Sequence, residues 1–220
     1  MGINVLQMNK LAAFETASWA LWSPEFNKRQ CLEAKPHLIR DYLAKRIDEL
    51  KNNVVLIGLN RSFNEKKAAR ASLQAYPTFA NFHAASHSGD GLLKETIGSL
   101  PNLQGAYMSD LCLDMQSKSA KVNINEKAAM RRLNEQLRIL GGASFHIVCF
   151  GASVFRFLAT LQSLTAEALE HGVLRIDLSV RPGQQLLCYK VIHYSYAVRY
   201  NRRERFKKQM STVNDLIGGL

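Results

Sequence analysis

The stretch VVLIGLNRS, residues 54–62, decides the fold. Four apolar residues followed by a glycine predict a short strand that is buried on both faces, as in the middle of a parallel sheet. Apolar residues at helical spacing over residues 36–53 predict an amphipathic helix that leads into this strand. An amide, a guanidinium and a hydroxyl then follow at Asn60, Arg61 and Ser62. Because ligands of open parallel sheets bind beyond the carboxyl ends of the strands, this strand end is a candidate functional position.

The same alternation of strand and helix continues downstream. The pattern predicts helices over residues 92–100, 126–140 and 152–161, and strands over residues 105–113 and 145–151. Strands that alternate with helices are typical of a parallel sheet covered on both faces. We therefore predict an α/β fold, a three-layer α/β/α arrangement with a central, mainly parallel four-stranded sheet.

The last part of the chain is expected to form a hairpin and a closing helix. Residues 173–180 and 184–194 flank an Arg-Pro-Gly turn signal, and residues 196–217 have the pattern of a helix. No repeat or linker is visible, and 220 residues suit one substantial core. We predict a single domain over residues 1–220, with an N-terminal helical extension over about residues 1–50.

Charge and composition narrow the partners. The 29 Lys and Arg against 18 Asp and Glu give a net charge of +11, which predicts attraction to polyanions such as nucleic acid or an anionic membrane surface. No apolar run is long enough to span a bilayer, and the N-terminus has no secretion signal. We therefore expect a soluble, monomeric protein in the cytoplasm, associated with the nucleoid if the source is bacterial, and no membrane partner.

Metal chemistry has little support in the sequence. The four cysteines form no CxxC pair and are expected to be buried thiols. His83 and His87 have the i, i+4 spacing of a metal-binding pair, but no acidic or cysteine ligand accompanies them. We predict no metal site.

Polar residues gather after each predicted strand. Beyond the first strand end, the others carry Ser109 and Asp110, the segment 151–153, and the segment 193–195. The carboxyl ends of parallel strands meet at one edge, so these groups are expected to lie together.

Five segments resemble the motifs of the uracil-DNA glycosylase superfamily, particularly its mismatch-specific branch. They are GLNRS (58–62), ANFH (80–83), GAYMSDLC (105–112), IVCFGASVFRFL (147–158) and HYSYAVRYNRR (193–203). The resemblance covers roughly residues 54–203, although each motif alone is weak. It implies a DNA-repair enzyme that hydrolyses the N-glycosidic bond of a damaged or deaminated base flipped out of DNA, with no cofactor.

The resemblance also implies roles for individual residues. Asn60 would position the attacking water, and His193 would donate a hydrogen bond to the leaving base. Phe82 would stack on the extruded base, and other base-binding positions would be Gly58, Asn81 and Asp110. Phosphate and other nucleic-acid contacts would come from Ser62, Ser195, Arg61, Arg199, Arg202 and Arg203.

Four residues depart from the family pattern, one of them His83, which stands where the mismatch-specific branch has a larger aromatic residue. Arg61 and Tyr194 stand where the family has proline, and Asp110 falls near an asparagine that reads uracil in several branches. An ionised aspartate only accepts hydrogen bonds, so it favours a base that presents N–H groups. These departures leave open a catalytically inactive member that binds nucleic acid or a nucleotide, and also an enzyme acting on a free nucleoside.

Structural roles are the alternative for each candidate residue. Asn60 would then be a turn residue, His193 would close a strand, Phe82 would belong to the core and Asp110 would cap a helix. The basic C-terminal helix would present a solvated face, although the aromatic residues among its charges favour nucleic-acid contact.

Overall fold

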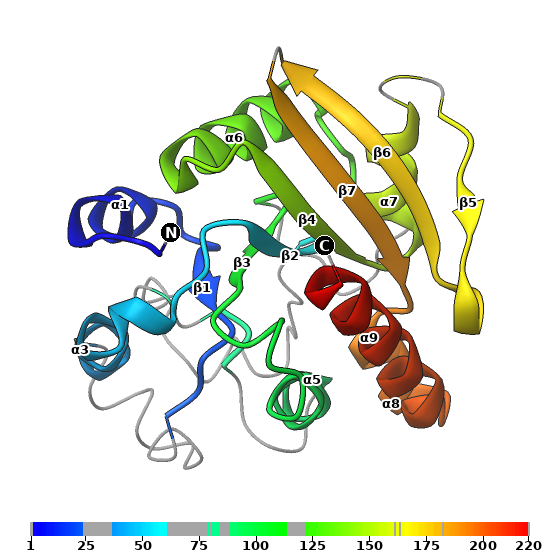
Figure 1. Ribbon diagram of the computed structural model, residues 1–220, viewed down its shortest axis with the longest axis horizontal. Coiled ribbons are helices and arrows are strands. Elements are labelled where there is room, and N and C mark those ends of the chain that lie inside the picture. Colours follow the sequence, from blue (N-terminus) through cyan, green and yellow to red (C-terminus); the bar gives the residue numbers. More distant parts are fainter. Residues whose placement is uncertain are drawn as a thin grey trace.

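The computed structural model describes residues 2–23, 37–60, 79, 81–83, 89–113, 122–160, 162, 164–181 and 183–219, and all structural statements below concern this part of the chain. Its centre is a seven-stranded sheet with the order β1-β3-β2-β4-β7-β6-β5 (Figure 1). The strands are β1 (Ser18–Trp19), β2 (Val54–Gly58), β3 (Tyr107–Asp110), β4 (Ser144–Phe150), β5 (Glu167–Ala168), β6 (Leu174–Arg181) and β7 (Gln184–Val191).

The α/β class is confirmed, whereas the predicted count of four strands is wrong. The inner strands β3, β2, β4 and β7 are parallel to their neighbours in this group. Three antiparallel strands extend the sheet: β1 pairs with β3 at one edge, and β6 and β5 follow β7 at the other. Two of these added strands have only two residues each, which is too short for a periodic sequence signal.

Helices pack against both faces of the sheet (Figure 1). One face contacts α1, α3, α6 and α7, and the other contacts α5, α8 and α9. The bounds are α1 (Val5–Leu11), α3 (His37–Lys45), α5 (Gly89–Ile97), α6 (Glu126–Leu140), α7 (Ala152–Thr160), α8 (Tyr194–Arg199) and α9 (Arg203–Gly218), with 3₁₀ turns η2 (Ile47–Glu49) and η4 (Glu170–Gly172).

Strand alternation sends successive side chains to opposite cores. In β2, Val55 and Ile57 join the core under α6 and α7, whereas Val54 and Leu56 join the core under α5 and α9. This period of two follows from the pleat of a strand. By the same alternation, the last two polar side chains of β3 face opposite helix layers.

The N-terminal and C-terminal segments differ in part from the sequence-based expectation. The N-terminal extension contains helices α1 and α3, but it also supplies β1, in which Trp19 pairs with Tyr107. The predicted closing helix is divided into α8 and α9, because Asn201 adopts a left-handed conformation (φ 52°) and the Arg202 amide donates to the Ala197 carbonyl oxygen at 2.7 Å. The predicted hairpin is present as the antiparallel pair β6–β7. None of the helices in the described ranges is both long and apolar enough to cross a membrane.

Candidate functional site

The four parallel strands end at one level and so define an edge. Gly58 pairs with Asp110, Ile57 with Cys149, and Phe150 with Val191. After β2 the chain first adds β3 on one side and then β4 on the other, so the strand order reverses between β2 and β4. Such a switch point is where open α/β sheets bind ligands.

A close cluster forms at the ends of β2 and β3. The Asn81 Nδ2 donates to Asp110 Oδ2 at 2.9 Å and to the Thr16 carbonyl oxygen at 3.0 Å. A Cβ added to Gly58 would lie 2.3 Å from Asp110 Oδ1 and 3.6 Å from the Phe82 ring. Glycine thus allows the close approach of β2 to this carboxylate, and the four predicted base-binding residues, Gly58, Asn81, Phe82 and Asp110, lie together.

The partners of Asn81 determine how its amide is oriented. A carboxylate and a carbonyl oxygen can only accept, so both bonds require the NH₂ group. The Asn81 Oδ1 then remains as an acceptor, and Asp110 also presents only acceptors. The cluster is thus built to receive N–H donors.

His193 is fixed by the start of α8. It is the N-cap of this helix, and its Nδ1 accepts from the Ser195 amide at 3.1 Å and is 2.7 Å from Ser195 Oγ. Because Nδ1 accepts from a backbone N–H, the hydrogen of the neutral imidazole is on Nε2. Burial against Phe150 and Tyr194 lowers the pKa of His193 to about 4. The ring is therefore neutral at pH 7 and has one N–H donor.

Tyr194 joins the histidine to the cluster. Its ring centroid lies 4.3 Å from that of His193, 5.2 Å from that of Phe150 and 6.5 Å from that of Phe82. Burial raises the pKa of the Tyr194 hydroxyl well above its usual range, and the nearby carboxylates Asp90 and Asp110 raise it further. From the sequence, Tyr194 was a departure from a motif and, with Tyr196, Tyr200 and Phe206, one of the aromatic residues among the C-terminal charges. Asp90 was not predicted, because nothing distinguished it from an ordinary helix-start residue.

The start of α5 packs tightly against α8. A Cβ added to Gly89 would lie 2.7 Å from Tyr194 Cδ2 and 2.8 Å from Ser195 Cα. This approach brings the neighbouring Asp90 to the Tyr194 hydroxyl. The position of Tyr194 is thus set by two helices as well as by the strand β7 that precedes it.

The other predicted residues fall into four groups. Asn60 is half-buried at the same edge, directly after Leu59, whose carbonyl oxygen accepts from the Cys112 amide at 2.8 Å. Ser195 contacts His193 instead of extending outward. Exposed positions on α8 and α9 or between them are occupied by Arg199, Arg202 and Arg203, whereas Arg61, Ser62 and His87 lie outside the described residues.

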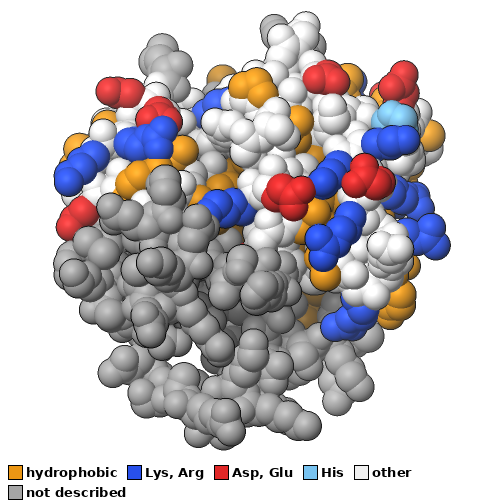
Figure 2. All heavy atoms as spheres, turned by 90° about the horizontal axis from the view of Figure 1, so that it is seen from below, with side chains coloured by type: hydrophobic (Ala, Val, Ile, Leu, Met, Phe, Trp, Pro, Cys, Tyr) orange, Lys and Arg blue, Asp and Glu red, His pale blue; other side chains and the backbone are white. Residues whose placement is uncertain are grey.

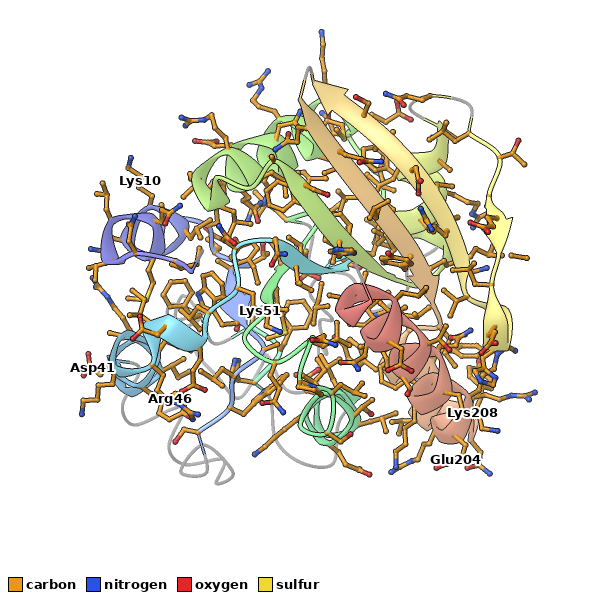
Figure 3. The ribbon with its side chains drawn as sticks, viewed as in Figure 1. Lys10, Asp41, Arg46, Lys51, Glu204 and Lys208 are labelled. Atoms are coloured by element: carbon orange, nitrogen blue, oxygen red, sulfur yellow. The ribbon has the colours of Figure 1, made fainter. Side chains whose placement is uncertain are left out.

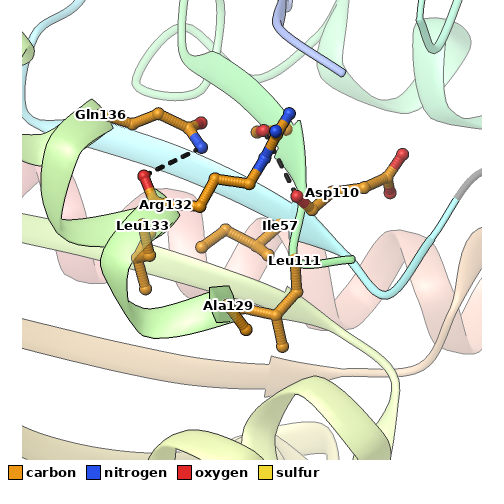
Figure 4. Close-up of a pocket in the computed structure, with 8 residues that line it drawn as sticks. Ile57, Asp110, Leu111, Ala129, Arg132, Leu133 and Gln136 are labelled. Atoms are coloured by element: carbon orange, nitrogen blue, oxygen red, sulfur yellow. Dashed lines mark hydrogen bonds between the residues drawn. The ribbon is translucent and has the colours of Figure 1, made fainter. Parts of the chain in front are cut away.

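The opposite face of β3 carries a second polar network, which shares Thr16 with the cluster. Ser109 Oγ lies 3.0 Å from Thr16 Oγ1, which accepts from Arg132 at 2.7 Å. A hollow with room for about one water molecule lies beside them, and Figure 4 shows the Asp110 carboxylate pointing away from Arg132. The Arg132 guanidinium therefore belongs to this structural network and not to the candidate site.

Metal-binding groups are scarce around the edge. Within the described ranges, no three His, Cys, Asp or Glu side chains come close enough to hold a metal ion. Cys149 and Cys188 are buried, and burial raises the pKa of both thiols.

No protein-family model matches the sequence, and neither does any curated protein. The resemblance to the uracil-DNA glycosylase superfamily therefore stays a prediction from the motifs, and the function is argued from the strand-edge geometry.

Proposed function

We propose that this protein hydrolyses the N-glycosidic bond of a damaged or deaminated base that has been flipped out of DNA. One observation carries the proposal. A neutral histidine with its only N–H on Nε2 stands at the carboxyl edge of a parallel sheet, and Tyr194 links it to the acceptor cluster of Asn81 and Asp110. That combination supplies a donor for a leaving group and acceptors for a base.

The reaction needs charge stabilisation more than a strong base. If the glycosidic bond breaks first, the sugar becomes an oxocarbenium-like cation and the base collects negative charge on a carbonyl oxygen. The Nε2–H of His193 would donate to that oxygen, and a fixed donor of this kind lowers such a barrier by about 3 kcal/mol. Asn60 would orient the attacking water, for which an amide suffices.

The acceptor cluster points to a class of base. Asp110 and the Asn81 Oδ1 both accept hydrogen bonds, so a base edge with N–H groups complements them. A bare carbonyl oxygen facing Asp110 would meet a second acceptor. We therefore expect bases with donor-rich edges to be preferred over those that present a carbonyl oxygen there.

The alternative function is a non-catalytic protein that binds nucleic acid or a nucleotide. The position of Tyr194 favours it, because this buried ring packs beside Phe82 in the region where an extruded base would stack. A base could enter only if the Tyr194 ring were displaced or the base were seated on its outer side.

Base excision can be tested with oligonucleotides that carry uracil, hypoxanthine, xanthine or a thymine mismatch, followed by alkaline cleavage at abasic sites. Cleavage that is lost in Asn60→Ala and in His193→Gln supports the proposal. The matched controls are Asn53→Ala, just before β2 at the opposite end of the strand from Asn60, and His171→Gln, in η4, because both side chains are exposed. Binding without an abasic product on any substrate would favour the non-catalytic alternative.

A further inference from the structure

An exposed pair of tyrosines marks the outer face of α8. Tyr196 and Tyr200 keep 48% and 55% of their surface exposed, and their ring centroids lie 4.4 Å apart with an interplanar angle of 37°. Arg199 shares this face, because residues at i, i+3 and i+4 of a helix are neighbours. Tyr194 and Phe206, which the sequence grouped with them, are buried in the core.

Positive charge surrounds this pair. Arg199, Arg202 and Arg203 are exposed, and no carboxylate among the described residues lies within ion-pair distance of them. Lys207 on α9 differs, since it pairs with Glu95 at 2.8 Å. Figure 2 shows Lys and Arg side chains at the α8–α9 side, with hydrophobic side chains and some Asp and Glu side chains among them, and Figure 3 shows Lys208 pointing outward from α9.

The patch and the candidate site lie on opposite sides of one short helix, α8. The helix that presents Tyr196 and Arg199 is the one capped by His193, and Tyr194 of its first turn reaches the acceptor cluster. A strand whose base contacted His193 would therefore have its neighbouring nucleotides near the outer face of α8 (Figure 1).

We propose that Tyr196, Arg199, Tyr200, Arg202 and Arg203, here called the tyrosine platform, bind an unpaired stretch of DNA next to the target base. The rings would stack on unpaired bases, and the arginines would contact the phosphates. In a duplex the bases stack on each other, so only the arginines would find partners there. The choice of DNA rests on the proposed function, whereas the stacking of unpaired bases rests on the platform itself.

Fluorescence anisotropy can separate stacking from charge. The probes are a labelled thymidine strand of about 12 nucleotides, within the site sizes of single-strand binders, and a duplex of the same length. Tyr196→Ala with Tyr200→Ala is expected to weaken single-strand binding about 5- to 100-fold per stacked base and to leave duplex binding nearly unchanged. Arg199→Gln with Arg202→Gln should weaken both and reduce the salt slope by about 0.7 per lost phosphate contact on the single strand.

Lys127→Gln with Arg131→Gln on α6 is the matched charge control, because both side chains are exposed and carry the same total charge. These control changes should leave the preference for single strand intact. Equal binding of the single strand by the wild type and by the double tyrosine variant, with unchanged circular dichroism, would overturn the platform and favour a protein partner for this Tyr- and Arg-rich surface. Tyrosine-dependent binding without base excision on any substrate would support the platform and contradict the proposed catalysis.

Discussion

Replacing Gly58 by alanine tests how closely β2 approaches the Asp110 carboxylate. The added Cβ would lie 2.3 Å from Oδ1, roughly 1 Å inside normal contact. Asp110 has a short side chain that is held by Asn81, so it cannot withdraw without losing that hydrogen bond. Forced overpacking of this kind costs about 1–3 kcal/mol. Gly58 does not have a positive φ, so we expect the backbone to accept alanine and the carboxylate contact to dominate the loss.

A double-mutant cycle isolates this contact. Urea unfolding would give the free energy of unfolding of Gly58→Ala, Asp110→Ala and the double variant. The unfolding midpoints can be compared directly where the slope of the free energy against urea concentration is the same in all variants. We expect the cost of Gly58→Ala to fall below about 0.5 kcal/mol once the carboxylate is removed. The control is Gly219→Ala, where an added Cβ would meet only the Asp215 carbonyl oxygen at an ordinary 3.5 Å. An equal cost of Gly58→Ala in both backgrounds would refute the close approach described above.

Three further predictions concern stability. Burial lowers the pKa of His83 from the usual 6.5 to about 4, so between these pH values the unfolded chain binds a proton that the native state does not. The free energy of unfolding should therefore fall by about 3 kcal/mol through this residue as the pH drops from about 6.5 to 4. In chemical denaturation, His83→Gln should flatten that part of the curve of stability against pH. Gly105→Ala, at φ 71° with an added Cβ 1.9 Å from the Glu49 carbonyl oxygen, should lower the melting temperature far more than Gly219→Ala does; similar melting temperatures would contradict this packing. Tyr107→Phe should cost about 1–2 kcal/mol in urea unfolding, because Gln136 Oε1 loses its 2.8 Å hydrogen bond in a buried environment; an unchanged midpoint would mean that this bond contributes nothing.

Local signals in the sequence were sufficient for some elements. The helix α6 begins and ends at the predicted residues, because Asn125 caps its start by accepting from the Ala128 amide and Gly141 ends it in the left-handed conformation. Those determinants all lie within a few residues of the helix. The strands β3 and β4, which precede α6 and α7, also have local apolar runs and were predicted correctly. The two-residue edge strands β1 and β5 have no such run and were not predicted.

The strand β1 depends on contacts that no local pattern carries, whereas the break between α8 and α9 is a local feature at Asn201 that the helical period of residues 196–217 conceals. The break needs a hydrogen bond that ends at the Ala197 carbonyl oxygen, and β1 exists only because Ser18 and Trp19 pair with β3. The pairing of β1 with β3 is a tertiary contact, and a strand of two residues has no periodic pattern that could signal it.

The candidate site, too, could be predicted from the sequence only in part. Polar residues directly after buried strands were enough to predict that Gly58, Asp110 and His193 share one edge. The orientation of the Asn81 amide could not be predicted, because it depends on Thr16 and Asp110, which lie 65 and 29 residues away along the chain. Acceptor-rich chemistry at this edge therefore becomes visible only in three dimensions.

The cap of α8 has one more consequence, which concerns acid. The lone pair on His193 Nδ1 that receives the Ser195 amide is the same lone pair that a proton would occupy. Protonation would therefore remove the helix cap, although Nε2 would keep its N–H, and the presentation of Tyr196 by α8 would be disturbed at the same pH. Because the pKa of His193 is about 4, the loss of the cap is confined to strongly acidic conditions. Across the physiological pH range, neutral His193 caps α8 through Nδ1 and keeps its one N–H donor on Nε2.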